Sequence, residues 1–479
     1  MDSKIVKNSV WNFARSIATV LFPLIAIPYV SRNLGVENLG KVNFANSFVG
    51  YFILLASLGV ETYAMKECSK LRGKVTELER TASEIFSINI VTMIGSYALL
   101  IGFVTFCEEL SAYANLIYML SFMIFFSVWG AEWLNLAFED FAYITKRTFL
   151  VQIISLSIIL LFVREHSDYY RYAFVVSLSA IIPGILNSFY RKKFCKVKFV
   201  TRLNFSKHIK PILLMFSLLL AQSIMSNIDI TMLGLFFNDT AVGLYSMAVK
   251  IYITVERIIS SLAYVLIPGL ARCFANDNYN EINLLLSNTM AVMLATVIPA
   301  AAFMFVLSEE IMIVVCGAEF AAAANCLKVL SLVMVINIIG GSFWGNLVLL
   351  PSNNEKYFMY AWVISAGINV VLNSYIIPIY GIEGAAFTTL FSVFIVLCLC
   401  KYFAPRSICI DINLSKLVFV LGGSFCIIIM SEIFKYMADN VYIRVAGSAI
   451  LGIIGYILVL FIGKHPLVIY FYNKIKDIV

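Results

Sequence analysis

Long apolar stretches alternate with short polar connections along the whole 479-residue chain. About fourteen of these stretches reach the roughly 20 residues that a helix needs to cross the hydrocarbon core of a bilayer. Backbone polar groups find no partner in lipid, so such stretches are helical when they span a membrane. The pattern predicts an all-α polytopic membrane protein with about fourteen transmembrane helices, and the main alternative is twelve. The expected spans are residues 10–31, 42–65, 83–106, 112–136, 143–163, 172–190, 211–235, 242–268, 286–308, 326–349, 357–379, 384–404, 415–435 and 443–463.

The overall composition supports membrane insertion. Hydrophobic residues form 61% of the chain and charged residues only 13%, against about a quarter charged in a typical soluble domain. A water-soluble domain cannot cover that much apolar surface. The chain is therefore expected to use lipid as its main solvent.

Lysine and arginine residues gather in every second connection. The densest group lies between residues 191 and 210. Loops rich in these residues stay on the cytoplasmic side, so we expect this group and both termini to be cytoplasmic. The net charge of +7 then reflects orientation and contact with anionic membrane lipids. It requires no nucleic-acid partner.

The sequence offers few groups for chemistry. Its ten cysteines are scattered, and neither a CxxC pair nor a Cys/His cluster with metal-ligand spacing occurs. A GxxxxGK(S/T) phosphate loop is also missing. The outer connections are too short to hold a catalytic domain. We therefore expect no cofactor, no metal and no enzymatic activity, and favour transport driven by a gradient.

A short internal repeat indicates two related halves. Leu34 to Gly40 closes the first span and opens the second, and Leu233-Gly234 with Val242 to Tyr245 does the same for the seventh and eighth. Two six-helix halves would be related by a pseudo-two-fold axis along the membrane normal, followed by two additional helices and a cytoplasmic tail. Chance recurrence of such pairs in apolar sequence is the alternative. The expected domains are residues 1–205, 206–408 and 409–479.

Polar residues recur at helical spacing inside four spans, two in each proposed half. Ionisable groups at membrane depth are costly unless they face a partner or a cavity. We therefore expect these polar stripes to line one central cavity. Their members are Asn8, Asn12, Arg15 and Thr19; Asn43, Asn46 and Ser47; Gln222, Ser226 and Asp229; and Ser246, Lys250, Thr254, Arg257 and Ser261.

The charges on these stripes favour an anionic substrate. Arg15, Lys250 and Arg257 outnumber Asp229, and guanidinium groups offer the bidentate geometry that phosphate oxygens accept. Two structural alternatives stay open. Arg15 is close enough to the cytoplasmic end of its span to extend its head group to the membrane surface. Asp229 and Lys250 would also suit a purely structural ion pair.

Three motifs stand out along the chain. The first runs from Asn12 through Pro23, Pro28-Tyr29 and Arg32-Asn33-Leu34-Gly35 to Gly40. The second, Glu132 to Glu139, is similar to a D-W-x-x-Q-G-x-E element, with Glu132, Asn135 and Ala137 in place of its Asp, Gln and Gly. The third, Asn369 to Ala386, contains Asn373, Ile377-Pro378, Gly381 and Gly384-Ala385-Ala386. Over about residues 5–405, these motifs resemble those of Wzx-type polysaccharide flippases.

This resemblance implies the multidrug/oligosaccharidyl-lipid/polysaccharide exporter fold and a place in the bacterial inner membrane. It implies that the chain moves a polyprenyl (undecaprenyl) diphosphate-linked oligosaccharide, with O-antigen as the first expectation, to the outer leaflet by alternating access. A polysaccharide polymerase and a chain-length regulator are the candidate protein partners. Lipopolysaccharide biosynthesis is the expected process.

Combined with the polar stripes, the resemblance assigns roles to single residues. Arg15, Lys250 and Arg257 are expected to hold the diphosphate, and Asp229 to carry a coupling ion or to form an ion pair. The candidates for contact with sugar hydroxyls are Asn12, Asn43, Asn46, Gln222 and Thr254.

Two other functions remain open on sequence grounds. A drug/cation antiporter of the same superfamily would share the fold, but a cavity for cationic drugs should be acidic. A membrane glycosyl- or acyltransferase is the enzymatic alternative, and it lacks an evident catalytic loop here.

Overall fold

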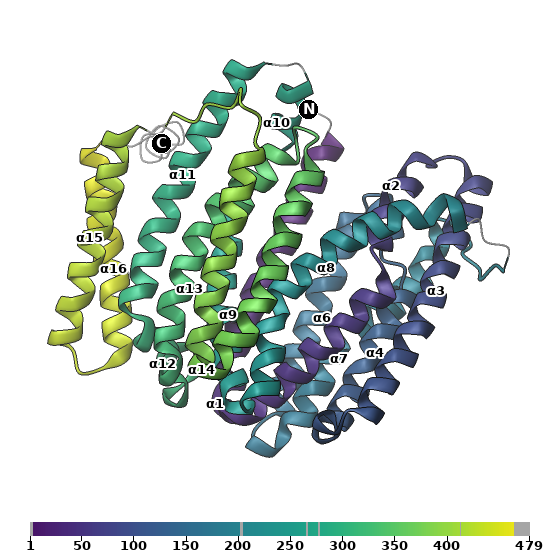
Figure 1. Ribbon diagram of the computed structural model, residues 1–479, viewed down its shortest axis with the longest axis horizontal. Helices are drawn as coiled ribbons and strands as arrows, with labels where there is room; N and C mark the ends of the chain where they lie inside the picture. The colour runs from purple at the N-terminus through teal and green to yellow at the C-terminus, as the bar shows by residue number, and fades with distance from the viewer. Residues whose placement is uncertain (1–2, 202–204, 265–266, 276–277, 412, 464–479) are drawn as a thin grey trace. The chain divides into compact units, whose positions relative to one another are not determined.

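The computed structural model describes residues 3–201, 205–264, 267–275, 278–411 and 413–463 (Figure 1). Across these residues the regular secondary structure is helical, without a strand. The predicted all-α class is therefore confirmed. Most of the expected cytoplasmic tail and the end of the eighth expected span, at residues 265–266, lie outside the described residues.

The helices follow one another with short connections. They are α1 (Ser3–Ser57), α2 (Val60–Lys70), α3 (Val75–Phe106), η1 (Glu108–Tyr113), α4 (Ala114–Trp129), α5 (Trp133–Ala137), α6 (Phe141–Phe162), η2 (His166–Asp168), α7 (Tyr169–Tyr190), η3 (Arg191–Lys193), α8 (Phe205–Phe236), α9 (Asp239–Tyr264), α10 (Ile267–Ala275), α11 (Tyr279–Val306), α12 (Ser308–Cys316), η4 (Ala318–Ala323), α13 (Ala324–Asn337), η5 (Ile338–Leu349), α14 (Glu355–Phe403), α15 (Leu414–Met437) and α16 (Val441–Ile462).

Eleven helices among the described residues are long and apolar enough to cross a membrane. Two of them contain two expected spans each, because the backbone leaves helical geometry at Gly35 (φ 71°) in α1 and at Gly381 (φ 57°) in α14. The expected span within α9 is not among the eleven, since Lys250, Glu256 and Arg257 raise its charge. Each expected span is nevertheless helical over most of its described residues, although turns at Leu58-Gly59 and at Gly130–Glu132 interrupt the second and the fourth, and this agrees with a count of about fourteen.

The chain forms two compact units, Met1–Gly243 and Leu244–Val479, which meet within α9. This boundary reflects the density of contacts in one conformation. It does not test the predicted domains 1–205, 206–408 and 409–479, which stay a prediction.

In the first unit, α1 is the central helix. It packs against α3, α4, α6 and α8, and α4 packs along α7. A buried cluster joins α2, α3 and α5 near one end of this unit, and Cys195 and Ile212 complete it. The Cys195 thiol is buried there, and this burial raises its pKa to about 11.

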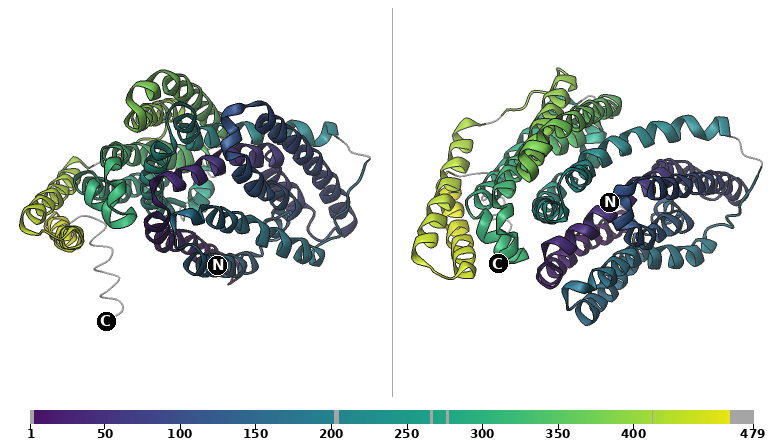
Figure 2. Two further views of the ribbon diagram at one scale, coloured as in Figure 1. Left: turned by 90° about the horizontal axis from the view of Figure 1, so that it is seen from below. Right: turned by 60° about the horizontal axis from the view of Figure 1, so that its bottom comes forward.

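In the second unit, α13 packs against α14 and α11, and α15 and α16 form a hairpin (Figures 1 and 2). The hairpin is attached to α11 through buried Val420, Ile427 and Leu460. Tyr456 of α16 donates a hydrogen bond to the carbonyl of Ala295 on α11 over 2.6 Å. The two C-terminal helices are thus packed on the second unit.

An extended segment follows the sixth expected span and runs along α3. The backbone N–H groups of Lys196, Lys198 and Val200 bond in turn to side chains of α3, and Ser83 and Ser87 accept the last two at 3.1 and 2.8 Å. Alternate residues of an extended chain point the same way, and residues four apart share a helix face. The two-residue spacing of the N–H groups along the segment therefore matches the four-residue spacing of the side chains that accept them on α3.

A second segment repeats this arrangement on α11. The N–H of Cys409 bonds to Asn283 over 3.1 Å, and that of Asp411 bonds to Ser287 over 3.0 Å. This segment follows the twelfth expected span as the first follows the sixth. The likeness of the two attachments is in keeping with the predicted internal repeat.

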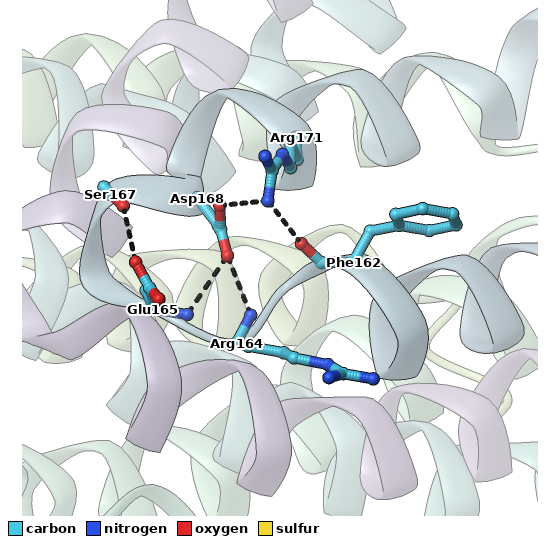
Figure 3. A network of polar contacts seen from close by, with 6 residues as sticks. All are labelled: Phe162, Arg164, Glu165, Ser167, Asp168 and Arg171. Carbon is cyan, nitrogen blue, oxygen red and sulfur yellow. Dashed lines mark hydrogen bonds and ion pairs between the residues drawn. The ribbon is translucent and has the colours of Figure 1, made fainter.

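Asp168 organises the turn between α6 and α7 (Figure 3). Its carboxylate accepts hydrogen bonds from the N–H groups of Arg164 and Glu165, at 2.9 and 3.1 Å, and from Arg171 at 2.6 Å. Asn38 also bonds to the carbonyl of His166 over 2.9 Å. This turn therefore fixes the break in α1 against the α6–α7 hairpin.

Candidate functional site

The nine candidate site residues lie on three helices. Four are on α1, two on α8 and three on α9. The first six belong to the first compact unit and the last three to the second. In chain order they are Asn12, Arg15, Asn43, Asn46, Gln222, Asp229, Lys250, Thr254 and Arg257.

A polar contact joins the second half of α1 to α8. The hydroxyls of Ser47 and Thr231 lie 3.2 Å apart, and Ser47 also donates to the carbonyl of Asn227 over 3.1 Å. Tyr51, one turn further along α1, reaches Thr231 at 3.2 Å. Polar residues of the second and seventh expected spans therefore meet inside the first unit.

Two of the candidates border this contact. Asn43 is one turn before Ser47 and is 7% exposed, and Asp229 is 3% exposed and interacts electrostatically with Tyr51. Asn46 is exposed and Gln222 is half-buried. Asp229 is therefore a buried acidic group inside a membrane-spanning helix, the kind of residue that marks an ion or substrate path.

Arg15 is half-buried on the first half of α1, and the side chain of Asn12 lies outside the description. Glu61 begins α2 and interacts electrostatically with both Arg15 and Glu132. Arg15 favours the negative charge of Glu61, whereas Glu132 disfavours it because two carboxylates repel each other.

On α9, two adjacent charged residues have different surroundings. Glu256 accepts a hydrogen bond from Asn337 over 2.7 Å, whereas the Arg257 side chain is exposed. Adjacent residues of a helix do not face one another. Lys250 and Thr254 are half-buried, and the Thr254 hydroxyl bonds to the Lys250 carbonyl over 2.6 Å.

A buried network around Arg147 was not among the sequence predictions. Arg147 is 6% exposed and donates to Glu132 over 2.9 Å and to Asn187 over 2.7 Å. Asn135 donates to the same Asn187 oxygen over 3.0 Å. The network joins α5, α6 and α7 through the two polar residues of the Glu132–Glu139 motif that lie deepest in the unit.

The end of this motif carries a second basic partner. Arg72 bonds to Glu139 over 2.8 Å and to the carbonyl of Ala137 over 2.7 Å. The sequence contained a signal for both pairs, because the motif has two acidic residues and the neighbouring connections supply arginines. Arg147 and Arg72 were instead interpreted only as orientation signals.

Asp140 follows the motif and caps α6. It accepts hydrogen bonds from the Tyr190 hydroxyl over 2.7 Å and from the Tyr143 N–H over 3.3 Å, with the Lys193 ammonium 3.5 Å away. Partial burial raises the pKa of Asp140, but the hydrogen bonds and Lys193 outweigh that effect and hold the pKa below its ordinary value.

The third motif forms a buried polar row on α14. Asn373 donates to Asn369 over 3.1 Å, and the Thr388 hydroxyl donates to Asn373. The row therefore joins the two parts of α14 on either side of the break at Gly381. Asn369 and Asn373 are fully buried. The amides of this motif therefore have a structural role, because they form buried hydrogen bonds within α14.

His208 contacts two side chains that are distant from it in the sequence. Its ring is buried and lies 2.7 Å from the Tyr63 hydroxyl and 3.0 Å from the Glu84 carboxylate. All three residues belong to the first unit. The partners are more than a hundred residues away in sequence, so local pattern could not reveal them.

Comparison with known proteins matches residues 5–274 to the model of a family described as "Polysaccharide biosynthesis protein". A putative O-antigen transporter of Shigella dysenteriae is 20% identical over 398 residues, which are 82% of this chain and 99% of that one. The probable low-salt glycan biosynthesis flippase Agl15 of Haloferax volcanii is 30% identical over 168 residues. That alignment spans 34% of each chain, about a third of the relative's length.

Solved structures share the fold. A lipid II flippase, MurJ, in an inward closed conformation superposes with a TM-score of 0.78 and 16% identity, over 97% of this chain and 100% of that one. An inward-facing multidrug resistance transporter of the MATE family, in the MOP superfamily, gives a TM-score of 0.58 and 12% identity, over 81% and 93% of the two chains. At these identities the likeness concerns the fold alone.

Proposed function

Because the chain belongs to the polysaccharide biosynthesis protein family, we propose that it is a flippase for a polyprenyl (undecaprenyl) diphosphate-linked oligosaccharide. The substrate is a repeat unit, with O-antigen as the first choice, and it moves from the cytoplasmic to the outer leaflet. The family match covers more than half of the chain, and this observation carries the proposal. The names of the Shigella and Haloferax relatives support it.

The chemistry of the substrate explains why a many-helix protein is needed. A diphosphate–sugar head must cross about 30 Å of hydrocarbon, whereas the polyprenyl tail can remain in lipid throughout. The protein must therefore offer a polar path to the head while leaving the tail in the bilayer. Polar stripes on long apolar helices suit both demands, and alternating access keeps the path from leaking.

Arg15, Lys250 and Arg257 bind the diphosphate in this proposal. The exposure of Arg257, on the side of α9 that Glu256 does not occupy, supports its role. Arginine binds phosphate oxygens in a bidentate way, and lysine acts as a point charge. Sugar hydroxyls contact the amides and the hydroxyl of the other candidates, which are Asn12, Asn43, Asn46, Gln222 and Thr254.

Asp229 is proposed to carry a coupling ion. Its burial among polar side chains of α1 and α8 supports this role, because an acidic group in a membrane span is usually functional. A purely structural ion pair is the competing role. Asp229→Asn would abolish a coupling role and leave the side-chain volume almost unchanged.

The cellular setting follows from the same proposal. The chain lies in the bacterial inner membrane with both termini in the cytoplasm, next to the enzymes that assemble the lipid-linked unit. A polysaccharide polymerase and a chain-length regulator would act on the flipped product. Transport of the lipid-linked unit then ends in the outer leaflet.

Depletion of the protein tests this proposal in cells. We expect loss of surface polysaccharide and accumulation of lipid-linked oligosaccharide that a membrane-impermeant glycosidase cannot reach in spheroplasts. Unchanged surface glycan, together with a raised sensitivity to cationic drugs, would favour the antiporter instead. An unchanged pool of lipid-linked glycan with an altered glycan structure would favour a transferase.

A further inference from the structure

Glu256 is an acidic residue in the membrane-spanning part of α9, and its surroundings are unusual. Its carboxylate accepts one hydrogen bond, from the side-chain amide of Asn337 over 2.7 Å. An ionised carboxylate that has left water needs strong partners, or it takes up a proton. A single neutral amide is a weak partner for a full negative charge. The Glu256 side chain is half-buried.

The helix that faces Glu256 changes its winding at this point. Asn337 ends α13, and the next twelve residues, Ile338–Leu349, form a π-helix. Most π-helical segments are single turns and occur at functional sites. A segment of this length inside a membrane span therefore needs something to hold it.

A second hydrogen bond shows what the π winding achieves. Ser260 of α9 lies 3.0 Å from Ser342 of η5. Glu256 and Ser260 are four residues apart, as expected for one face of an α-helix, but Asn337 and Ser342 are five apart. Residues five apart share a face only when the helix has π winding, whose bonds join i and i+5. Both contacts with α9 are thus satisfied together only in the π form.

The oxygen of the Asn337 amide can accept a new hydrogen bond. This oxygen is buried, has no hydrogen-bond partner among the described residues, and lies beside Gly341. An ionised Glu256 can only accept, whereas a protonated carboxyl carries an O–H that can donate. Rotation of the amide would then pair this O–H with the Asn337 oxygen. Protonation therefore changes which bond joins the two helices.

Few other charges border Glu256. Arg257, its neighbour on α9, interacts with it electrostatically. On α13 and η5 the only charged residue is Lys328, nine residues before Asn337 and thus about 13 Å away along the helix. The elements that pack against η5 carry Arg272 on α10, Glu281 on α11, Glu355, Lys356 and Lys401 near the ends of α14, and Glu383 just after the break at Gly381.

We propose that Glu256 is a proton-binding site that controls the winding of η5. With Glu256 ionised, its bond to Asn337 holds the π register. A proton on the carboxyl replaces this charge-assisted bond with a weaker bond between neutral groups, and residues 338–349 rewind toward an α-helix. The consequence for transport rests on the proposed function: proton uptake at Glu256 would couple flipping to a proton gradient.

Hydrogen exchange of the full chain in lipid nanodiscs tests the switch without any substrate. Exchange of peptides that cover residues 338–349 is followed from about pH 5 to about pH 8, which lies above the ordinary titration range of glutamate, after correction for intrinsic exchange. We expect the wild type to change protection several-fold across this range. Glu256→Gln, which imitates the neutral carboxyl, should show the low-pH pattern at every pH.

Glu310→Gln is the matched control. Glu310 is another carboxylate of the second unit, but it already has basic neighbours, with Lys435 at 3.8 Å and Arg444 at 3.9 Å. Its replacement should leave the pH response of η5 intact. A wild-type η5 that does not respond to pH would overturn the proposal, and so would a response that survives Glu256→Gln.

Glu256→Asp serves if the Gln variant does not fold. It keeps the titrating group and should keep the pH response, whereas a response lost in Glu256→Asp with a folded protein would contradict proton binding at this residue. Flipping is measured separately. A chain that shows the switch but moves no lipid-linked glycan would refute the proposed function and leave the proton site standing.

Discussion

Gly243 lies against the backbone of Val36 so closely that a Cβ atom on Gly243 would come within 2.1 Å of the Val36 carbonyl oxygen. Gly40 lies equally close to the backbone of Asp239, because a Cβ on Gly40 would lie 1.8 Å from the Asp239 carbonyl oxygen. The two stretches that the sequence indicated as an internal repeat therefore cross each other, with glycine at both points of closest approach.

Gly40→Ala is expected to destabilise the protein. The added methyl group has no room and must displace backbone, and overpacking of this kind costs about 1–3 kcal/mol. Thermal unfolding in detergent, followed by fluorescence, measures the effect. Gly50→Ala is the control on the same helix, since a Cβ there meets nothing within 4 Å. An equal fall in Tm for both variants would contradict the close approach.

Glu132→Gln should destabilise the protein clearly, although glutamate and glutamine side chains have nearly the same size and shape. It leaves the buried Arg147 guanidinium without its carboxylate, and loss of one member of a buried pair costs on the order of 3 kcal/mol. A second change, Arg147→Met, should restore part of the loss because it removes the uncompensated charge.

The control for this pair is Glu77→Gln. Glu77 and Lys74 form an ion pair at 3.4 Å with both side chains well exposed, and such pairs contribute less than about 1 kcal/mol. A loss of Tm for Glu77→Gln as large as that for Glu132→Gln would show that burial of Arg147 does not decide the effect.

Asp140 predicts a pH dependence of stability. Its pKa in the folded protein lies below the ordinary value, although partial burial opposes the shift, because Tyr190, the Tyr143 N–H and Lys193 stabilise the charged form. A depressed pKa gives stability that is present above the unfolded-state pKa and is lost as the pH falls through the folded-state pKa.

Asp140→Asn should therefore be less stable than the wild type at neutral pH. The difference in Tm should shrink as the pH falls below about 4, the ordinary range for aspartate. Thermal unfolding of both proteins over a pH series measures this. A difference that stays constant or grows at acid pH would contradict the assignment of the shift to Asp140.

Substrate binding is tested by replacing the three proposed diphosphate ligands. Arg15→Gln, Lys250→Gln and Arg257→Gln in one protein should reduce flipping at least tenfold at a normal protein level, since loss of even one charged hydrogen bond costs about 1.5–3 kcal/mol. Arg272→Gln, an exposed arginine of α10, is the control. Intact flipping by the triple variant would remove these residues from the binding site.

The sequence predicted the fold well because hydropathy and helix length are local properties. Each expected span is helical over most of its described residues. The sequence indicated the stretches around Gly40 and Gly243 only as an internal repeat, and it did not predict that they cross closely. Which glycine meets which carbonyl depends on how distant helices cross.

Other features could not be predicted from the sequence, because they depend on contacts between residues that are distant along the chain. Arg147 follows Lys146 near the start of a span, where charge patterning indicates topology, and its burial depends on Asn187 forty residues away. The residues of η5 are apolar and glycine-rich and suit an ordinary span. Their π winding accompanies the contacts of Asn337 and Ser342 with α9, which join residues distant in the sequence.

Reconstituted flipping tests the central claim most directly. The purified protein is placed in liposomes that carry a labelled undecaprenyl diphosphate-linked oligosaccharide in both leaflets, and a membrane-impermeant glycosidase is added outside. Protein-free liposomes should protect about half of the label, because head groups cross lipid too slowly. With the protein, we predict that nearly all of the label becomes accessible. If the protein-containing liposomes, with correctly folded protein, protect the same half, the chain is not a flippase for this substrate.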